Sequence, residues 1–321
     1  MNIAFAGFRH SHIVGLYSVA LENGNVIGCY EENEETRTEM ENSKNVHFNY
    51  NTYDELLNSP DVDAVAIGDY YQKRGKLVIE ALKHGKHVIC DKPMCTSLEE
   101  LDEIERLSRE NNLTVACMLD LRYWPQSNKA KELIENGEIG RINMVSFTGQ
   151  HPLSYGSRPQ WYFEEGKHGG TINDIAIHGI DVIRYITGKN LTRVDLKKEW
   201  NAYATEVPHF LDSAQFVIDM NGTSVMADVS YAGPACNVLL PTYWEFRFWG
   251  SDGMLTYNFR DKTVTVYKKT EEVIECEMLD HDYFLDFIND FIKETKGEKT
   301  RLSEQDMLES QRQVLTIQKH K

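Results

Sequence analysis

The stretch Gly85–Pro93, with the sequence GKHVICDKP, decides how the first part of this chain is predicted to fold. Its segment His87–Cys90 is short and mostly apolar, which is typical of a strand buried on both faces. Amphipathic helical patterns at Lys73–His84 and Ser97–Asn111 lie on either side of it. Similar apolar runs occupy Ile3–Ala6, Val26–Tyr30, Ala64–Ile67 and Thr114–Met118. This alternation predicts an α/β fold with a doubly wound parallel sheet, whose ligand binds at the carboxyl ends of the strands.

After about residue 120 the pattern changes to one in which strands predominate. Alternating apolar residues flank Asn221-Gly222, a dipeptide that supplies the positive φ angles of a two-residue hairpin turn. Further strands are predicted at Ile142–Gly149, Trp244–Gly250 and Thr263–Lys268, and helices at Ser127–Asn136, Asp174–Thr187, Asp282–Glu294 and Ser303–His320. We therefore predict two domains, residues 1–120 and residues 121–321. The second is an α+β domain with an open, mostly antiparallel sheet, and its C-terminal helix is expected to pack back on the first domain.

The charge balance argues against two classes of partner. With 34 basic and 50 acidic residues the net charge is -16, so neither nucleic acid nor an anionic membrane is an expected partner. No apolar run approaches the roughly 20 residues of a membrane span, and the strand-like run at the start leaves no room for a signal peptide. The cysteines are scattered, which predicts free thiols in a cytoplasmic protein. They are Cys29, Cys90, Cys95, Cys117, Cys236 and Cys276.

A nucleotide site is predicted where the first strand meets the first helix, at Gly7–His12. The segment stands where a dinucleotide-binding G-x-G-x-x-G motif would, but Arg9 and His12 replace the second and third glycines. The helix N-terminus still offers free amides to an anion, and Arg9 is able to bind phosphate. Glu31 ends the second strand, where a carboxylate grips the ribose hydroxyls and disfavours a 2′-phosphate, so NAD is predicted over NADP. Two alternatives stay open. Gly7–His12 is a tight turn that binds no nucleotide, or Glu31 lies in a solvated turn and binds no ribose.

The stretch Gly169–Asp181, with the sequence GGTINDIAIHGID, carries the predicted proton-transfer residues. Asp174 and His178 are four residues apart and share one face of a helix. His178 is the candidate base for removing a hydroxyl proton. Asp174 would orient or charge-stabilise its imidazole, or bind the substrate hydroxyl itself. Lys92 is the candidate donor to the developing alkoxide. The alternatives are a core histidine beside a surface acid, and, for Asp181, pairing with Arg184 instead of binding substrate.

These residues together resemble the Gfo/Idh/MocA family of nicotinamide-dependent oxidoreductases. Gly85–Pro93 is similar to the family's G-K-H-V-x-x-E-K-P, with Asp91 for the glutamate, and Gly169–Gly188 is similar to its G-G-x-x-x-D-x-x-x-H-x-x-D…G pattern. Asp69-Tyr70 and Arg74 depart from it, since most members carry Thr-Pro and then histidine there. The resemblance implies a Rossmann domain followed by a domain whose sheet mediates homodimers or homotetramers. It also implies sugar or polyol substrates, catalytic Lys92, Asp174 and His178, and cofactor contacts from Gly7, Phe8, Arg9, His10, His12, Glu31, Asp69, Asp91 and Lys92.

The aromatic loop His151–Gly170 is predicted to form part of the substrate wall. Tyr155, Arg158 and Trp161 suit a polyhydroxylated ligand, although aromatic packing at a sheet or subunit interface is an open alternative. Arg122 and Asp181 complete the predicted substrate-binding set. The histidines show neither H-x-x-x-H nor H-E-x-x-H spacing, so no metal is predicted.

The sequence therefore predicts an NAD-dependent dehydrogenase that acts on a CH–OH group of a sugar, polyol or related small molecule. Two alternatives stay open. One is an NAD-dependent glycosidase that uses transient oxidation. The other is a non-catalytic ligand-binding or regulatory protein with weakened nucleotide affinity.

Overall fold

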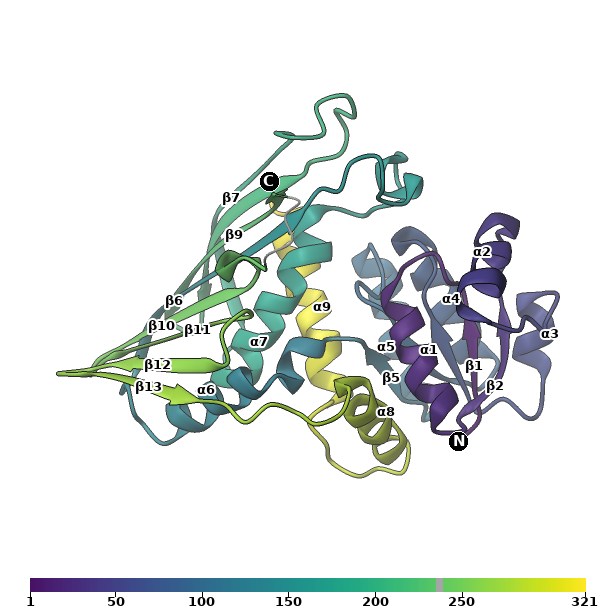
Figure 1. Ribbon diagram of the computed structural model, residues 1–321, viewed down its shortest axis with the longest axis horizontal. Coiled ribbons are helices and arrows are strands. Elements are labelled where there is room, and N and C mark those ends of the chain that lie inside the picture. Colours follow the sequence, from purple (N-terminus) through teal and green to yellow (C-terminus); the bar gives the residue numbers. More distant parts are fainter. Residues whose placement is uncertain (235–238) are drawn as a thin grey trace. The chain divides into compact units, whose positions relative to one another are not determined.

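The computed structural model describes residues 1–234 and 239–321, and Cys236 lies outside this described part. The chain forms two compact units (Figure 1). The first contains Met1–Met118, Gly166–Gly169 and His281–Gln311, and the second contains Leu119–Glu165, Gly170–Asp280 and Arg312–Lys321. Two segments that are late in the sequence thus belong to the first unit.

The first unit is built on a parallel sheet with the strand order β2-β1-β3-β4-β5. The strands are β1 (Ile3–Ala6), β2 (Val26–Tyr30), β3 (Ala64–Ile67), β4 (His87–Cys90) and β5 (Val115–Cys117). Four of them are almost wholly buried, as their apolar sequences require. The prediction of a doubly wound parallel sheet is confirmed. The strand order reverses between β1 and β3, which makes their carboxyl ends the expected ligand-binding edge.

Helices cover this sheet. They are α1 (His12–Glu22), α2 (Glu34–Lys44), α3 (Tyr53–Asn58), α4 (Tyr71–Lys83), α5 (Leu98–Asn111) and α8 (Tyr283–Glu294). The side chain of Ser97 accepts a hydrogen bond of 3.1 Å from the backbone N–H of Glu100, so Ser97 caps the start of α5. Helix α8 packs on α1, where a Cβ atom added to Gly15 would come 2.5 Å from the Phe284 ring. This close packing explains why a late segment joins the first unit.

The second unit contains a larger sheet with the strand order β13-β12-β11-β10-β6-β9-β8-β7. The strands are β6 (Ile142–Pro152), β7 (Leu191–Trp200), β8 (Ser213–Met220), β9 (Thr223–Gly233), β10 (Glu245–Gly250), β11 (Met254–Asn258), β12 (Thr263–Tyr267) and β13 (Glu271–Glu275). All its pairs are antiparallel except β6 with β9. The predicted hairpin turn is confirmed, because Asn221 and Gly222 join β8 to β9 with φ angles of 46° and 79°.

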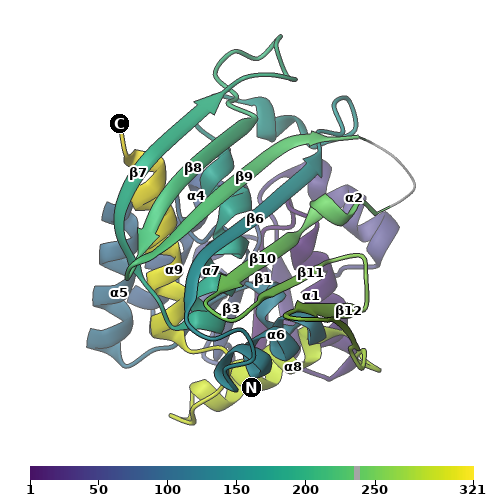
Figure 2. The ribbon, with the colours of Figure 1, turned by 90° about the vertical axis from the view of Figure 1, so that its left-hand side faces the viewer.

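Helices lie along one face of this sheet, and Figure 2 shows the strands from the other face. These helices are α6 (Pro125–Glu135), α7 (Ile177–Thr187) and the end of α9 (Glu304–Lys319). A Cβ atom on Gly179 would come 2.1 Å from the Phe147 ring, so α7 packs closely on β6. In the described residues, no helix has both the length and the apolar character that a bilayer crossing requires.

Candidate active site

The loop after β1 is shaped by Gly7, whose φ of +81° favours glycine. A Cβ atom there would also come 2.8 Å from the backbone nitrogen of Asp69. Phe8 turns inward and packs edge-on against Tyr17 and Phe48. Ser11, at the start of α1, makes no side-chain capping hydrogen bond, and the first turn of the helix carries no acid. The amides at this end of α1 are therefore suited to an anion.

Glu31 connects the end of β2 to this loop. Its Oε2 accepts a hydrogen bond of 2.6 Å from the backbone N–H of Phe8, and its Oε1 accepts one of 2.8 Å from that of Asn33. Glu31 is only 3% exposed, and burial raises the pKa of its carboxyl. The alternative of a solvated turn is thus wrong for Glu31. Each carboxylate oxygen of Glu31 has a further lone pair with which to accept a hydrogen bond from a ribose hydroxyl. The predicted ribose contact therefore stays a prediction.

Asp69 follows β3, and two basic side chains, Lys73 and Arg9, lie close to its carboxylate. Lys73 Nζ lies 2.8 Å from Asp69 Oδ2 and also pairs with the exposed Glu32. Arg9 Nε lies 3.9 Å from Asp69 Oδ1, and its guanidinium lies over the Tyr70 ring. Arg9 is thereby positioned beside the loop where phosphate binding is predicted.

The turn that carries Lys92 is held by Arg74, which is fully buried. Arg74 Nη1 donates to the carbonyl oxygens of Lys92 and Pro93 at 2.5 and 3.2 Å, and Nη2 donates to Asp91 Oδ2 at 3.1 Å. The Lys92–Pro93 peptide bond is cis. Arg74, which departs from the family pattern, therefore fixes the backbone at the predicted catalytic lysine and at the proline after it.

Asp91 also contacts His10. The Nδ1 atom of His10 hydrogen-bonds to Asp91 Oδ2, and Nε2 lies 3.2 Å from the Tyr71 hydroxyl. Burial lowers the pKa of His10 to about 3, so its imidazole is neutral at pH 7. Burial acts to raise the pKa of Asp91, but His10 and Arg74 outweigh it and hold that pKa well below its usual range. Asp91 is therefore a carboxylate in the folded protein.

His178 lies on α7 beside a carboxylate that the sequence analysis missed. Its Nδ1 atom is 3.2 Å from Oδ1 of Asp120, which begins the 3₁₀ turn Asp120–Tyr123 after β5. His178 is 5% exposed, and its ring packs edge-on against Trp244. Asp120 is 58 positions from His178, so helical spacing did not reveal the pair. The available clue was its place just after the last parallel strand, since ligands bind at such ends.

Asp174 lies in a π-helical turn, Ile172–Ala176, and α7 begins only at Ile177. The prediction of a regular helix from Asp174 is wrong in this first turn, because the wider turn changes which side chains share a face. The carboxylate accepts a hydrogen bond from the Tyr231 hydroxyl on β9. Burial and the neighbouring Asp174 raise the pKa of Tyr231 well above its usual value, so the phenol keeps its proton. The end of the helix at Gly188, with φ of 66°, is as predicted.

Two of the predicted substrate-binding residues bind each other. Arg122 Nε donates to Asp181 Oδ2 at 2.8 Å, and Nη2 pairs with Oδ1. Both side chains are 1% exposed. The open alternative for Asp181 named Arg184 as its partner, and Arg184 Nε donates to Asn190. The Arg122–Asp181 pair fastens the 3₁₀ turn of Asp120 to the helix of His178.

The aromatic loop is largely packed on itself. Arg158 donates to the carbonyl oxygens of Pro152 and Leu153 at 2.7 and 2.8 Å. Trp161 is buried and stacks on Tyr162, whereas Tyr155 is half exposed. Arg158 and Trp161 thus make packing contacts within the loop, and their part in substrate binding stays a prediction.

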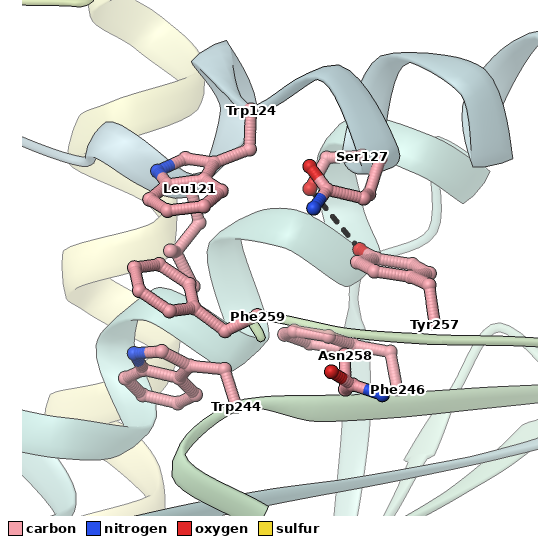
Figure 3. A pocket seen from close by; sticks show the side chains of 9 residues that line it. Leu121, Trp124, Ser127, Trp244, Phe246, Tyr257, Asn258 and Phe259 are labelled. Carbon is pink, nitrogen blue, oxygen red and sulfur yellow. Dashed lines mark hydrogen bonds between the residues drawn. The ribbon is translucent and has the colours of Figure 1, made fainter. Parts of the chain in front are cut away.

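Trp244, whose ring contacts that of His178, belongs to an aromatic cluster (Figure 3). Trp244 stacks on Phe246, Phe246 on Tyr257, and the Tyr257 hydroxyl lies 3.1 Å from Ser127 Oγ. The cavity that these side chains line measures about 10 Å³, room for a single water molecule. It is too small for a substrate, and the cluster serves as an apolar wall against which the imidazole rests.

Two family models match the chain in succession. Residues 2–118 match the oxidoreductase family with an NAD-binding Rossmann fold, and residues 127–256 match the Gfo/Idh/MocA C-terminal domain. The chain therefore belongs to the Gfo/Idh/MocA family of oxidoreductases, and the resemblance inferred from its motifs is confirmed.

The chain is similar to several known proteins. It is 31% identical over 155 residues to the uncharacterized oxidoreductase YrbE of Bacillus subtilis, covering 48% of this chain and 44% of YrbE. It is 30% identical over 161 residues to myo-inositol 2-dehydrogenase of Thermotoga maritima, covering 50% and 47%. The matched regions thus span less than half of these relatives. A putative oxidoreductase from Erwinia carotovora atroseptica has the same fold, with a TM-score of 0.87, 23% identity and coverage of 99% and 98%.

The residues at the carboxyl end of β1 fit a dinucleotide. Gly7 permits the tight turn, and the uncapped start of α1 supplies amides for a pyrophosphate. Glu31 is fixed at the end of β2, where the ribose acid of such sites stands.

Proposed function

We propose that the protein is a nicotinamide-dependent dehydrogenase that oxidises a CH–OH group of a sugar, a polyol or a related small molecule, with NAD as its preferred cofactor. Membership of the family supports the redox class, and the similarity to a myo-inositol 2-dehydrogenase supports a polyhydroxylated substrate. The observation that carries the proposal is the pair of the buried His178 and the partly exposed Asp120, because alcohol oxidation needs a base and this imidazole has a carboxylate beside it.

His178 is proposed to accept the hydroxyl proton at Nε2. A carboxylate beside Nδ1 favours the tautomer that carries its hydrogen on Nδ1, which leaves the Nε2 lone pair for the substrate. The apolar wall of Trp244 restricts water on one side of the ring. Asp120 also stabilises the imidazolium that forms when the proton arrives.

Lys92 is proposed to donate a hydrogen bond to the oxygen that loses its proton, and so to stabilise the developing alkoxide. Arg74 fixes the backbone around Lys92, which reduces the freedom of the side chain to leave a productive position. Asp174 is proposed to bind a neighbouring substrate hydroxyl, with its carboxylate oriented by Tyr231. A bound nicotinamide would supply the hydride acceptor, held by Gly7, Phe8, Arg9, His10, His12, Glu31, Asp69 and Asp91.

The first test is a reduction assay with NAD or NADP and a panel of sugars and polyols, myo-inositol included. We expect a substrate-dependent appearance of NADH. The variants Lys92→Met and His178→Asn should each lower kcat by about 10²-fold or more, and His178→Asn should leave NADH binding unchanged. Lys83→Met and His84→Asn, at exposed positions of the first unit, are the matched controls. Full activity of His178→Asn would remove this residue as the base.

Two results of the same preparation would instead favour the alternatives. Calorimetric titration that finds binding of neither NAD nor NADP would indicate a non-catalytic protein. Release of the aryl group from an aryl glycoside, dependent on NAD but without accumulation of NADH, would indicate a glycosidase.

The face of the larger sheet seen in Figure 2 supports a homodimer or homotetramer. Leu196 and Met226 on this face are 60% and 55% exposed, and Val217 lies between them in register. Such a row of apolar side chains is suited to a second copy of the sheet. Sedimentation velocity should therefore detect an oligomer that Met226→Glu dissociates and that Met278→Glu, at another exposed methionine, leaves intact.

We also propose a cytoplasmic location. Cys29, Cys90, Cys95, Cys117 and Cys276 are all buried, free thiols, which suits a reducing compartment. Burial raises the pKa of Cys29 and of Cys90 to about 12, so both remain protonated.

A further inference from the structure

Three potential metal ligands meet in the first unit, two from the β1–α1 junction and one from the loop after β4. One donor atom each of His10, His12 and Asp91 lies within 4.8 Å of the other two. The Nδ1 atom of His12 is 3.5 Å from Asp91 Oδ1, and the Nδ1 atom of His10 contacts Asp91 Oδ2. We infer that these three residues form a binding site for one divalent transition-metal ion of the Zn²⁺ class.

The spacing of the donor atoms suits such an ion. Ligands at about 2.0–2.1 Å from a tetrahedral Zn²⁺ lie about 3.3 Å from one another. The separation of 3.5 Å between His12 and Asp91 is close to this value. The Nδ1 atom of His10 also contacts Asp91, and a small rotation of its ring would make room for the ion.

The donor types decide which ions are expected. Two imidazoles and one carboxylate suit Zn²⁺, Co²⁺, Ni²⁺ and Cu²⁺, whereas Mg²⁺ and Ca²⁺ prefer sets made of oxygen alone. Three protein ligands leave a fourth tetrahedral position for water or an oxygen atom of a bound molecule.

The surroundings of the site support His10 and Asp91 as ligands. Tyr71 lies 3.2 Å from Nε2 of His10, the contact that orients a metal-binding histidine. The backbone N–H of Lys92 donates to Asp91 Oδ1 at 2.8 Å, and Arg74 donates to Oδ2. Because Arg74 already balances the charge of Asp91, we expect a weaker affinity than at a catalytic zinc site without such a neighbour.

The site is accessible to an ion from solvent at His12. The side chain of His12 is 46% exposed, whereas His10 and Asp91 are buried. An ion would therefore meet His12 first and then displace the proton between the two buried ligands. The sequence spacing H-x-H gave no indication of this site, because the third ligand follows His12 by 79 positions in another loop. His10, His12 and Asp91 are also among the predicted cofactor contacts, so the metal titration is carried out without nucleotide. Its outcome does not depend on the redox activity proposed above.

The experiment uses the full chain without an affinity tag, stripped with a chelator and then titrated with Zn²⁺ against a chromophoric competitor. We expect one equivalent to bind. His12→Ala should lower the affinity by about 100-fold and Tyr71→Phe by about 10-fold, in line with the loss of a ligand and of its supporting partner. His84→Ala, which removes an exposed imidazole elsewhere, should leave the affinity unchanged.

A second readout tests the ligand set directly. Co²⁺ bound to the stripped protein should give the visible absorption of a tetrahedral site, and His12→Ala should abolish it. Because His12 is exposed, this variant is expected to keep the fold, which circular dichroism would verify. Equal Zn²⁺ affinities of the parent protein and His12→Ala would overturn the inference, as would a Co²⁺ spectrum that does not respond to His12.

Discussion

Glu304 is expected to make the stability of the first unit depend on pH in an unusual direction. It begins α9, and its carboxylate accepts a hydrogen bond from the Ser108 hydroxyl on α5. Burial raises the pKa of its carboxyl from 4.5 to about 7, against the effect of that hydrogen bond. The carboxyl is therefore mostly protonated in the folded chain at pH 6 and mostly ionised in the unfolded chain.

The sign and size of the effect follow from linkage. Between about pH 4.5 and pH 7 the folded state binds more protons at this site than the unfolded state, so the free energy of unfolding falls as the pH rises. Below about pH 4.5 the contribution of Glu304 to the free energy of unfolding does not change with pH, and above about pH 7 that contribution is lost in full. A difference of about 2.5 pKa units, at about 1.4 kcal/mol for each unit, corresponds to a loss of about 3 kcal/mol.

Glu304→Gln keeps the shape of the side chain and cannot ionise. We expect it to raise the free energy of unfolding at about pH 8 by about 2–3 kcal/mol, and to have little effect at about pH 5. Urea denaturation of the full chain, followed by circular dichroism and by tryptophan fluorescence, measures both values and tests whether the transitions coincide. Glu298→Gln, at an exposed site nearby, is the matched control. The reasoning is refuted if Glu304→Gln and Glu298→Gln are equally stable at about pH 8.

Two further predictions concern the second unit. Asp181→Ala leaves the buried Arg122 guanidinium without its carboxylate. The free energy of unfolding should therefore fall by about 3–5 kcal/mol. A raised KM at unchanged stability would indicate that Asp181 binds substrate instead. Asp120→Asn should lower kcat by about 10²- to 10⁴-fold. It should also move the acid limb of the kcat/KM profile to lower pH, because no carboxylate then favours protonated His178. An unchanged pH profile would exclude Asp120 as the residue that positions His178.

Most of the first sheet was predictable because burial on both faces forces its strands to be short and apolar. The hairpin at Asn221-Gly222 was equally clear, since few dipeptides adopt two positive φ angles. β7 illustrates the opposite case. This edge strand is charged, only partly buried and interrupted by register shifts, so its sequence carries no regular alternation. The placement of α8 on α1 depends on packing around Phe284 and has no local sequence pattern.

The candidate site likewise contains residues that the sequence identifies and residues that only the structure identifies. Lys92, Asp174 and His178 were identified because they stand in motifs, but their partners come from distant parts of the chain. Arg74 precedes Lys92 by 18 residues, and Asp120 precedes His178 by 58. Helical spacing assigned Asp174 to a regular helix face, although the π-helical turn there gives it Tyr231 as a partner. Periodicity thus predicts elements, whereas contacts between residues of different elements follow only from the folded chain.

The departures from the family pattern around Lys92 are best understood as one coordinated change. Asp91 is one methylene shorter than the family's glutamate, and Arg74 is longer than the family's histidine, so the guanidinium spans the gap at 3.1 Å. The same guanidinium reaches the carbonyl oxygens of Asp69 and Lys92. A histidine at position 74 is too short to make all these bonds, and a glutamate at position 91 would crowd the arginine. The departures at positions 91 and 74 therefore compensate one another, and the turn that presents the lysine is preserved.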